Sequence, residues 1–416
     1  ASSVQMPKLK DFILVGELGL DGKLRGVNGV LPLLISASMC GYKNFIIPEE
    51  NAKEASYIDG INVYAFPTLN GVLGFLSGED EVCPIEKSEF VDLPDDIEYP
   101  VDLSLVKGQE VAKRAIEIAV SGGHNILLVG APGAGKTMLA RCIPTIMPDM
   151  TFEEALETTK IHSVAGTLTD EGIVRTRPFM TPHHTATNIA LIGGGTNAKP
   201  GVISLAHNGV LYLDELPEYP RATLECLRQP LEDRVVTVSR AKLTVNYPAS
   251  FIMCASMNPC PCGNYGSKKL ECKCSPAQIM KYKAKISGPL LDRIDLQVEV
   301  DCVEYDDLVS KEVGESSASV KRRVNRTRAI QRERFKNDKI MTNSEMTEKH
   351  LAKYCKLTKE EEELLKASFE AFKLSARARG RILKVARTIA DMSLSEDILP
   401  EHLLEAISYR KFDINK

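Results

Sequence analysis

The sequence lacks any apolar stretch that approaches the roughly 20 residues of a membrane-spanning helix. It also lacks a leader in which positive charges precede an apolar segment, internal repeats, and low-complexity tracts. These absences exclude membrane spans and solenoid architectures, and we expect a cytoplasmic protein with no membrane partner. The chain begins with Ala rather than Met, so we expect a fragment and base no fold prediction on its first few residues.

An excess of basic charge is absent as well, because 52 Lys and Arg residues face 56 Asp and Glu residues, for a formal net charge of −4. Without a global basic field, any contact with nucleic acid must come from local patches. The densest basic run is residues 319–336, "SVKRRVNRTRAIQRERFK", which is predicted to be helical. Such a run is typical of a solvated helix face, and contact with phosphate is the alternative.

What the sequence does contain is enough apolar material for two or three globular domains, because 44% of its 416 residues are hydrophobic and 26% are charged. We predict an α/β domain at 1–95, an α/β core at 96–302 and a helical domain at 303–416. Residues 91–105 combine prolines and acids without periodicity and are predicted as a linker.

Hydrophobic periodicity supports this division. Residues 11–90 are predicted to follow the order strand, helix, strand, helix, strand. In the core, "HNILLVG" is a continuous apolar strand between two helical segments, which is typical of a central parallel strand covered on both faces. Further strands are predicted at "GVLYLDEL" and "FIMCAS", with a polar hairpin between them, so the fold class is α/β with a doubly wound parallel sheet. Beyond residue 303 the spacing is helical.

Residues 130–137, "GAPGAGKT", match the pattern G-x-x-x-x-G-K-[ST] between an apolar strand and a helix, and we name them the phosphate loop. Its glycines permit a tight curl that turns backbone N–H groups toward a polyphosphate. Lys136 is predicted to reach the β- and γ-phosphates of ATP, and the Thr137 hydroxyl to ligate Mg²⁺. A turn that binds nothing is the alternative. The predicted nucleotide-contacting residues are Gly130, Ala131, Pro132, Gly133, Ala134, Gly135, Lys136, Thr137 and Met138.

Two acids at the end of "GVLYLDEL" are candidates for the chemistry of hydrolysis, and we name them the acid pair. Asp214 is predicted to hold Mg²⁺, and Glu215 to orient or deprotonate the attacking water. An Asp-Glu pair after a strand can also cap the next helix. Asn258, at the end of "FIMCASMN", could reach the γ-phosphate, although Asn at a strand end is usually a turn former. Arg293 in "GPLLDRID" is predicted either to reach a neighbour's phosphate or to pair with an adjacent aspartate.

These segments, together with "MNPCPCG" and "SARARGRILKVARTIAD", resemble the AAA+ ATPases of the magnesium-chelatase-like group, specifically the bacterial ComM/YifB competence-associated group. The resemblance covers residues 96–416 and implies an AAA+ P-loop core with a C-terminal helical lid. It implies that Asn258 is the first sensor residue and that Arg293 is a finger acting on a neighbouring subunit. By the same resemblance, Arg377 is a lid sensor that touches the γ-phosphate of its own subunit.

The resemblance also implies an activity. We expect a homo-oligomeric, hexameric ring that hydrolyses ATP with Mg²⁺ and acts on single-stranded or branched DNA. The expected process is branch migration during homologous recombination in natural transformation, which makes the chain a helicase or translocase. Two alternatives stay open: a magnesium-chelatase-type remodelling ATPase that inserts a metal into a tetrapyrrole, and a nucleotide-gated assembly factor with weak turnover.

Upstream, residues 14–55 resemble the later half of a Lon-protease-like domain. The resemblance implies that the earlier half lies before the start of this chain, so we expect a partial domain. The first predicted helix, in "GVNGVLPLLIS", has no Lys or Ser-Lys arrangement suited to nucleophilic catalysis. We therefore expect no peptidase activity.

Two further segments of the core are candidates for nucleic-acid contact. Residues 160–204 are longer than a simple connection, and loops of that length are usually functional. The hairpin at 234–247 is predicted to project from the same face, so that both segments line the channel of a ring and touch nucleic-acid backbone. His183 and His184 are expected to make structural or polar contacts, because no metal-ligand spacing surrounds them. The basic residues proposed for the hairpin are Arg234, Arg240 and Lys242.

Four of the eleven cysteines lie within residues 258–276, which we name the cysteine knuckle. They are Cys260, Cys262, Cys272 and Cys274. Four thiolates in one loop suit a closed tetrahedral Zn²⁺ site, although Cys-x-Cys is less diagnostic than Cys-x₂-Cys, so unligated thiols are the alternative. Disulfides are disfavoured in a reducing compartment. A metal there would hold the strand end at Asn258 and would be structural rather than catalytic.

Overall fold

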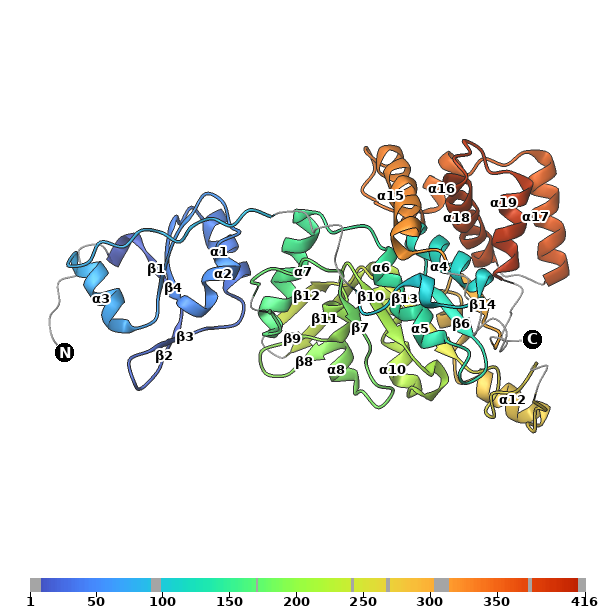
Figure 1. Ribbon diagram of the computed structural model, residues 1–416, viewed down its shortest axis with the longest axis horizontal. Helices are drawn as coiled ribbons and strands as arrows, with labels where there is room; N and C mark the ends of the chain where they lie inside the picture. The colour runs from blue at the N-terminus through green and yellow to red at the C-terminus, as the bar shows by residue number, and fades with distance from the viewer. Residues whose placement is uncertain are drawn as a thin grey trace.

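The computed structural model describes residues 9–90, 99–169, 171–240, 243–266, 270–302, 314–372 and 376–410. It has an N-terminal α/β unit at one end, a central α/β core, and a group of C-terminal helices beside the core at the other end (Figure 1). The predicted α/β class is confirmed. No helix in these ranges is long and apolar enough to cross a membrane. The predicted domain limit at 95 lies outside these ranges, and the limit at 302 adjoins residues outside them, so both stay predictions.

The N-terminal unit is a small parallel sheet with helices packed on it. Its elements are β1 (Ile13–Leu14), β2 (Glu17–Leu18), β3 (Leu24–Arg25), α1 (Val30–Met39), β4 (Asn44–Pro48), α2 (Ala52–Ala55), β5 (Asn62–Phe66) and α3 (Leu69–Ser77). The strand order is β1-β4-β5, and Phe45 and Ile47 of the central strand pack against Val30 and Leu34 of α1. The strands β1, β4 and β5 and the helices α1 and α2 follow the predicted order within residues 11–90, whereas the hairpin of β2 and β3 and the helix α3 were not predicted. The likeness to a Lon-protease-like domain stays a prediction.

The core is built on a five-stranded sheet in which all neighbouring strands are parallel. The strands are β6 (Ile126–Val129), β7 (Phe179–Met180), β10 (Val210–Leu213), β13 (Ile252–Met257) and β14 (Leu296–Glu299). Their order is β14-β6-β13-β10-β7. Since the strands are parallel, their carboxyl ends share one edge of the sheet, which we name the carboxyl edge, and their amino ends share the opposite amino edge.

Helices cover both faces of this sheet, as the continuous apolar pattern of β6 predicts. Ile126 and Leu128 lie in one apolar cluster, whereas Leu127 and Val129 lie in another, because successive side chains of a strand point to opposite faces. The core helices are α4 (Glu110–Gly122), α5 (Lys136–Arg141), α6 (Ile143–Ile146), α7 (Phe152–Ala165), α8 (Asn188–Ile192), α9 (Val202–Leu205), α10 (Arg221–Glu225), α11 (Arg228–Asp233), α12 (Pro276–Lys283) and α13 (Gly288–Leu291).

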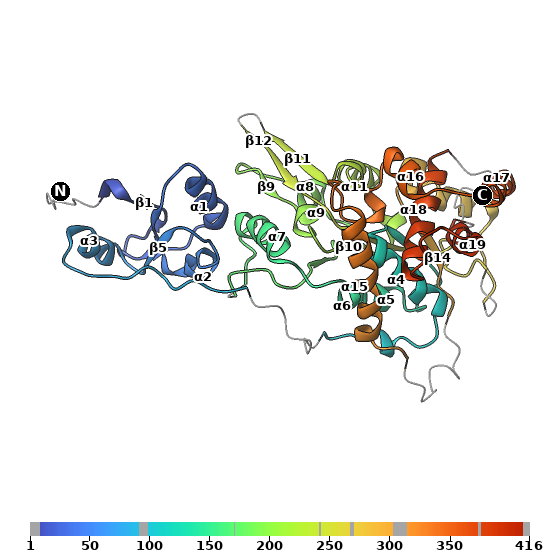
Figure 2. The same cartoon turned by 90° about the horizontal axis from the view of Figure 1, so that it is seen from above.

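Two hairpins extend the core on one side (Figure 2). The polar hairpin expected from the sequence is formed by β11 (Val235–Arg240) and β12 (Leu243–Pro248), which pair antiparallel. A shorter hairpin of β8 (Gly193–Gly194) and β9 (Lys199–Pro200) lies within the long segment 160–204. That segment also supplies β7, so part of what the sequence analysis treated as a loop completes the edge of the sheet.

The C-terminal helices, which we name the lid, pack directly on the core. They are α15 (Ser317–Arg334), α16 (Glu348–Tyr354), α17 (Lys359–Phe372), α18 (Ala376–Met392) and α19 (Pro400–Ser408). One apolar cluster runs from the sheet through Ile116 of α4 into Val324 of α15 and Ile389 of α18. The lid is therefore held against α4 by a shared core.

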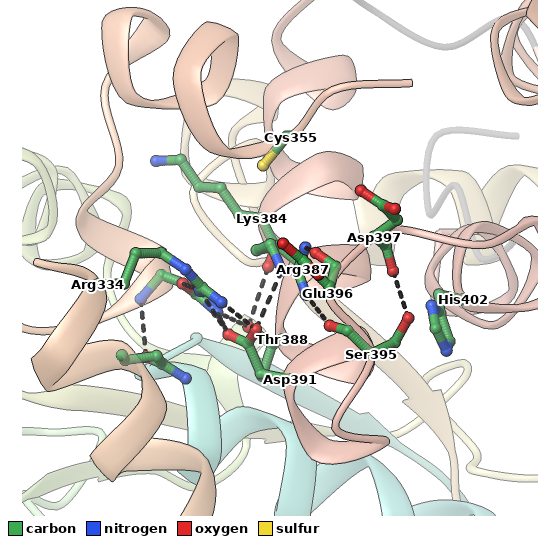
Figure 3. Close-up of polar contacts among 12 residues, drawn as sticks. Arg334, Cys355, Lys384, Arg387, Thr388, Asp391, Ser395, Glu396, Asp397 and His402 are labelled. Carbon is green, nitrogen blue, oxygen red and sulfur yellow. Dashed lines mark hydrogen bonds and ion pairs between the residues drawn. The ribbon is translucent and has the colours of Figure 1, made fainter. Parts of the chain in front are cut away.

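A buried carboxylate inside the lid binds two arginines (Figure 3). Asp391 accepts hydrogen bonds from Arg334 Nη1 at 2.7 Å and from Arg387 Nε at 3.0 Å. Arg387 also donates to the backbone oxygens of Ser395 at 2.6 Å and Glu396 at 2.7 Å. Removing one partner from such a buried set costs about 3–5 kcal/mol, because it leaves an uncompensated charge. The network fixes α18 against α15 and against the turn that follows α18.

Candidate functional site

The phosphate loop connects the buried strand β6 to helix α5, and its shape depends on glycine. Gly133 and Gly135 have φ angles of 78° and 89°, in the left-handed region that residues with a Cβ rarely adopt. At Gly130, a Cβ would overlap the carbonyl oxygen of Val300, so the chain can pass this residue, which follows β14, only without a side chain. The glycines found in the sequence are therefore required by the backbone of the loop.

Lys136 is the first residue of α5 and lies back against the phosphate loop. Its Nζ donates hydrogen bonds to Gly130 O at 2.6 Å, to Ala131 O at 2.9 Å and to Asn258 Oδ1 at 3.2 Å. The side chain is buried, and this burial lowers the pKa of Lys136, while the carboxylate of Asp214 opposes the shift. The ammonium is thus held at the mouth of the loop, between the loop and the end of β13.

The acid pair follows β10 and meets Thr137 across the carboxyl edge. Thr137 Oγ1 donates to Asp214 Oδ2 at 3.2 Å and accepts from the hydroxyl of Tyr212 at 3.3 Å. Ser256 Oγ and the backbone N–H of Glu215 both donate to Asp214 Oδ1. The carboxylate of Asp214 is therefore oriented by several donors before any ligand binds.

Glu215 has a φ angle of 53°, an uncommon value for a residue with a side chain. Its carboxylate is about half exposed, and Oε2 lies 3.7 Å from His184 Nδ1. The strained backbone turns this side chain out of the sheet edge, next to the phosphate loop, where it is free to face solvent and a ligand.

The predicted residues Lys136, Thr137, Asp214, Glu215 and Asn258 thus come together at the carboxyl edge. They do so because β6, β10 and β13 are neighbours in the sheet and run in the same direction. Ligands of open parallel sheets bind outside the carboxyl ends of the strands. The geometry matches a site for a nucleotide polyphosphate.

Comparison with known proteins decides the family. The family described as "Magnesium chelatase, subunit ChlI" matches residues 102–308, its C-terminal region matches 314–410, and "Subunit ChlI of Mg-chelatase" matches 1–51. Competence protein ComM of Haemophilus influenzae is 43% identical over 406 residues, which cover 97% of this chain and 78% of that protein. The chain belongs to the magnesium-chelatase-like ComM/YifB group of AAA+ ATPases.

Other relatives place it within this family. The uncharacterized protein YifB of Escherichia coli is 42% identical over 98% of this chain and 78% of that protein. Magnesium-chelatase subunit ChlI of Olisthodiscus luteus is 25% identical over 37% of this chain and 49% of that protein. The similarity to the ComM/YifB proteins therefore extends over the N-terminal unit, the core and the lid. The similarity to that chelatase subunit covers only part of the chain.

Membership in the AAA+ family implies ATP and Mg²⁺, and the oxygen atoms at the carboxyl edge fit this metal. Hydroxyl and carboxylate oxygens are the hard ligands that Mg²⁺ prefers, and those of Thr137 and Asp214 face each other beside Lys136. These two residues would hold the ion. When bound, Mg²⁺ neutralises charge on the β- and γ-phosphate oxygens.

Arg293 lies at the amino edge of the sheet, away from the phosphate loop. Its carbonyl oxygen accepts a hydrogen bond from Asn125 Nδ2 at 3.0 Å, and Asn125 directly precedes β6. The four residues of β6 separate this point from the phosphate loop by about 13 Å. The guanidinium donates to Pro289 O at 2.8 Å and pairs with Glu232. Arg293 and the phosphate loop of its own chain are therefore on opposite edges.

Arg377 shares the amino edge with Arg293. Its Nη1 lies 3.9 Å from Asp292 Oδ2, and its side chain is 70% exposed. Nearby, Arg381 Nη1 donates to Asp295 Oδ1 at 2.6 Å, which ties α18 to the start of β14. The resemblance implied that Arg377 touches the γ-phosphate of its own subunit. The structure instead keeps Arg377 away from its own phosphate loop, because this end of α18 is anchored at the amino edge.

Asp295 is the buried joint between the core and the lid. Its Oδ2 accepts a hydrogen bond from Asn125 N at 3.1 Å and lies 3.5 Å from His124 Nδ1. Burial acts to raise the pKa of Asp295, but Arg381 and His124 outweigh it and hold the pKa well below its usual range. The carboxylate therefore stays charged and links β6, β14 and α18.

The three predicted nucleic-acid contacts are separated by the structure. Arg240 is exposed near the tip of the hairpin, with Nε 3.4 Å from Gly195 O of the neighbouring hairpin. Arg234 precedes the hairpin and bonds to Ser250 Oγ at 3.0 Å and Glu345 Oε1 at 3.0 Å, so it faces the lid. Lys242 lies outside the described residues.

The four cysteines of the knuckle converge on one point. Their sulfur atoms all lie within 4.8 Å of one another. Cys260 is fully buried, and its Sγ accepts a hydrogen bond from Tyr265 N at 3.3 Å. Hydrogen bonds from the backbone of Asn264 and Lys273 lower the pKa of Cys262 to about 6. Backbone hydrogen bonds also act to lower the pKa of Cys272 and Cys274, but burial and the neighbouring thiols outweigh them and raise it. The set could hold a soft or borderline metal ion.

Two features of the site were not expected from the sequence. A pocket of about 470 Å³ lies between Gln109, Glu299 and Tyr409, and Gln109 Nε2 reaches Ala134 O of the phosphate loop at 3.4 Å. Its size suits part of a small ligand. The only signal was "GQE" at the start of α4. The contact of His184 with Glu215 was also missed, since the two residues are distant in sequence.

Proposed function

We propose that this protein is a ring-forming, Mg²⁺-dependent ATPase that moves on DNA, with branch migration during recombination of incoming DNA as its process. The observation that carries the proposal is the division between the two edges of the sheet. The phosphate loop, the acid pair and Asn258 meet at the carboxyl edge, whereas Arg293 lies at the amino edge. One edge would bind the nucleotide, and the other would supply a cation to a neighbouring subunit.

The proposed chemistry assigns one role to each group at the carboxyl edge. Backbone N–H groups of the phosphate loop and the ammonium of Lys136 neutralise the terminal phosphates. Glu215 accepts a proton from water as the water oxygen attacks the γ-phosphorus and the bond to ADP breaks. Asn258, which already contacts Lys136 at 3.2 Å, positions the attacking water near the γ-phosphate. His184 holds the carboxylate of Glu215 until a ligand displaces that contact.

The ring follows from the placement of the arginines. The Arg293 side chain is 12% exposed and is paired with Glu232, whose side chain is 65% exposed. A neighbour's phosphate would replace this solvated carboxylate as the counter-charge of the arginine. Because its own phosphate loop is on the other edge, the nucleotide within reach belongs to another subunit. We assign Arg377 to the same interface, acting on the neighbour's nucleotide. The number six rests on family likeness.

The DNA substrate rests on two supports. One is the likeness to the competence protein ComM of Haemophilus influenzae over 97% of this chain. The other is Arg240, an exposed cation near the tip of a hairpin that projects from the core. A local patch of this kind is what a chain of net charge −4 needs to contact a phosphate backbone. Zinc at the cysteine knuckle is a separate proposal, because it rests on the geometry of the thiols.

The test is the ATPase rate of the whole chain with and without forked DNA. We expect DNA to stimulate turnover and the binding of DNA to weaken with salt. Lys136→Ala should remove nucleotide binding and serve as the inactive control. Turnover that is unchanged by any DNA would contradict the DNA motor and favour an assembly factor. Stimulation only by partner subunits and a tetrapyrrole would favour the metal-inserting ATPase.

A further inference from the structure

Four thiols converge beside the phosphate loop with the geometry of a metal site. Cys260 Sγ lies 3.4 Å from Cys262 Sγ and 3.7 Å from Cys272 Sγ, and the last two are 3.7 Å apart. Sulfur ligands at the corners of a tetrahedron around Zn²⁺, with Zn–S of about 2.3 Å, are separated by about 3.8 Å. The observed spacing therefore leaves room for one zinc ion among the thiols of Cys260, Cys262, Cys272 and Cys274.

Other uses of these thiols fit less well. A disulfide needs sulfur atoms about 2.05 Å apart, far closer than any pair measured here. Among the described residues, this is the sole group of three or more Cys, His, Asp or Glu side chains whose ligand atoms cluster so tightly. A backbone N–H that points at a thiolate, as Tyr265 N points at Cys260 Sγ, is an outer-shell contact that orients a metal ligand.

The knuckle also touches the phosphate loop. Gly263, one residue after Cys262, has a φ of 82°, and a Cβ on it would overlap the ring of Pro132. On the other side, Asn258 lies two residues before Cys260 and accepts a hydrogen bond from Lys136. The turn that carries the first two cysteines is thus packed between the phosphate loop and the end of β13.

We infer that the cysteine knuckle binds one Zn²⁺ ion through its four thiolates, and that the metal fixes the knuckle as an outer support of the phosphate loop. The first part stands on the thiol geometry alone. The second part, a control of nucleotide affinity by zinc, rests on the proposed function of the phosphate loop. Loss of the metal frees the turn at Gly263, and the loop then loses the surface against which Pro132 and Lys136 are held.

The metal itself is tested by its content in the purified whole chain. We expect one zinc per chain by mass spectrometry of metals, and loss of that zinc in the double variant Cys272→Ser/Cys274→Ser. Cys83→Ser, at an exposed cysteine outside the knuckle, is the matched control and should keep its zinc. Should the double variant fail to fold, a chelator and then Zn²⁺ alone are applied to the unmodified chain. A chain that neither holds zinc nor takes it up after chelation would overturn the site.

The coupling is tested by nucleotide affinity in the same samples. Chelated but folded protein should bind an ATP analogue at least about tenfold more weakly, and added Zn²⁺ should restore the affinity. Gly263→Ala should weaken nucleotide binding while it keeps zinc. Equal affinity with and without zinc would overturn the coupling and leave the metal site standing. A zinc-loaded chain that binds no nucleotide at all would instead refute the proposed ATPase function.

Discussion

At the carboxyl edge of the core sheet, Lys136 and Asp214 are held in place by hydrogen bonds within their own chain. At the amino edge, by contrast, Arg293 and Arg377 are paired with Glu232 and Asp292, acids on or near the surface. The first edge is organised before a ligand arrives, which is what electrostatic stabilisation of a transition state requires. The second edge carries arginines whose partner acids are partly or largely solvated.

Under the proposed function, this difference would leave each chain with an incomplete active site. A finger arginine contributes mainly by neutralising charge in the transition state of phosphoryl transfer. If that arginine lay at its own carboxyl edge, each subunit could hydrolyse ATP alone. Its place at the amino edge would make hydrolysis depend on assembly.

Arg293→Ala should give the largest effect. We expect turnover to fall about 10³-fold or more, because the transition state loses its finger, while the affinity for ATP stays nearly unchanged. The rate is measured at saturating ATP, and affinity is measured with a fluorescent analogue. Arg322→Ala, at an exposed arginine of the lid, is the control and should keep its rate. If Arg293 instead acts within its own chain, adding subunits with an intact Arg293 will not restore turnover at the sites of the variant.

Glu215→Gln should lower turnover about 10²- to 10⁴-fold and retain ATP binding, since the amide cannot accept the proton of water. Mixing this variant with Arg293→Ala and measuring turnover tests whether the two edges act together across an interface. A mixed ring contains sites with an intact Glu215 facing an intact Arg293, so part of the activity should return. If mixing restores nothing, the two residues do not act across an interface.

Asp295→Asn should destabilise the fold by about 3–5 kcal/mol, because Arg381 would lose its buried counter-charge. The free energy of unfolding is measured by urea titration, with the exposed Asp397→Asn as control. Since the pKa of Asp295 is lower in the folded chain than the unfolded value of about 3.9, its contribution is complete above that pH and declines as pH falls below it. The difference between the two proteins should therefore shrink in acid, and a constant difference would contradict this assignment.

Arg240→Ala should have the smallest effect, a loss of DNA affinity of a few fold with a salt slope reduced by about one. Arg234→Ala is the control, because Arg234 faces Glu345 and should leave DNA binding unchanged. Binding is measured by fluorescence anisotropy over a range of salt concentrations. An equal loss of DNA affinity in both variants would contradict the assignment of DNA contact to Arg240 at the tip of the hairpin and not to Arg234 at its base.

The basic run at 319–336 shows what sequence reasoning could not settle. Lys321 pairs with Asp149 at 2.6 Å, and Arg323 pairs with Glu117 at 2.6 Å. Arg334 is bound by the buried Asp391, and Arg328 Nη2 donates to Val120 O at 2.9 Å. These four side chains are bound by groups of the protein itself, so they form neither a solvated face nor a phosphate-binding face. Their acids come from α4, from the segment before α7 and from α18, and only folding brings them together.

The phosphate loop, the alternation of buried strands and helices, and the group of four cysteines could be predicted from the sequence alone. These features depend on residues close together in the chain, where glycine conformations and apolar periodicity act directly. The tertiary structure alone decided that Arg377 joins Arg293 at the amino edge, that Arg234 faces the lid, and that Gly263 abuts the phosphate loop. The physical reason is that a side chain distant in sequence meets its partner only where strand order and helix packing place both.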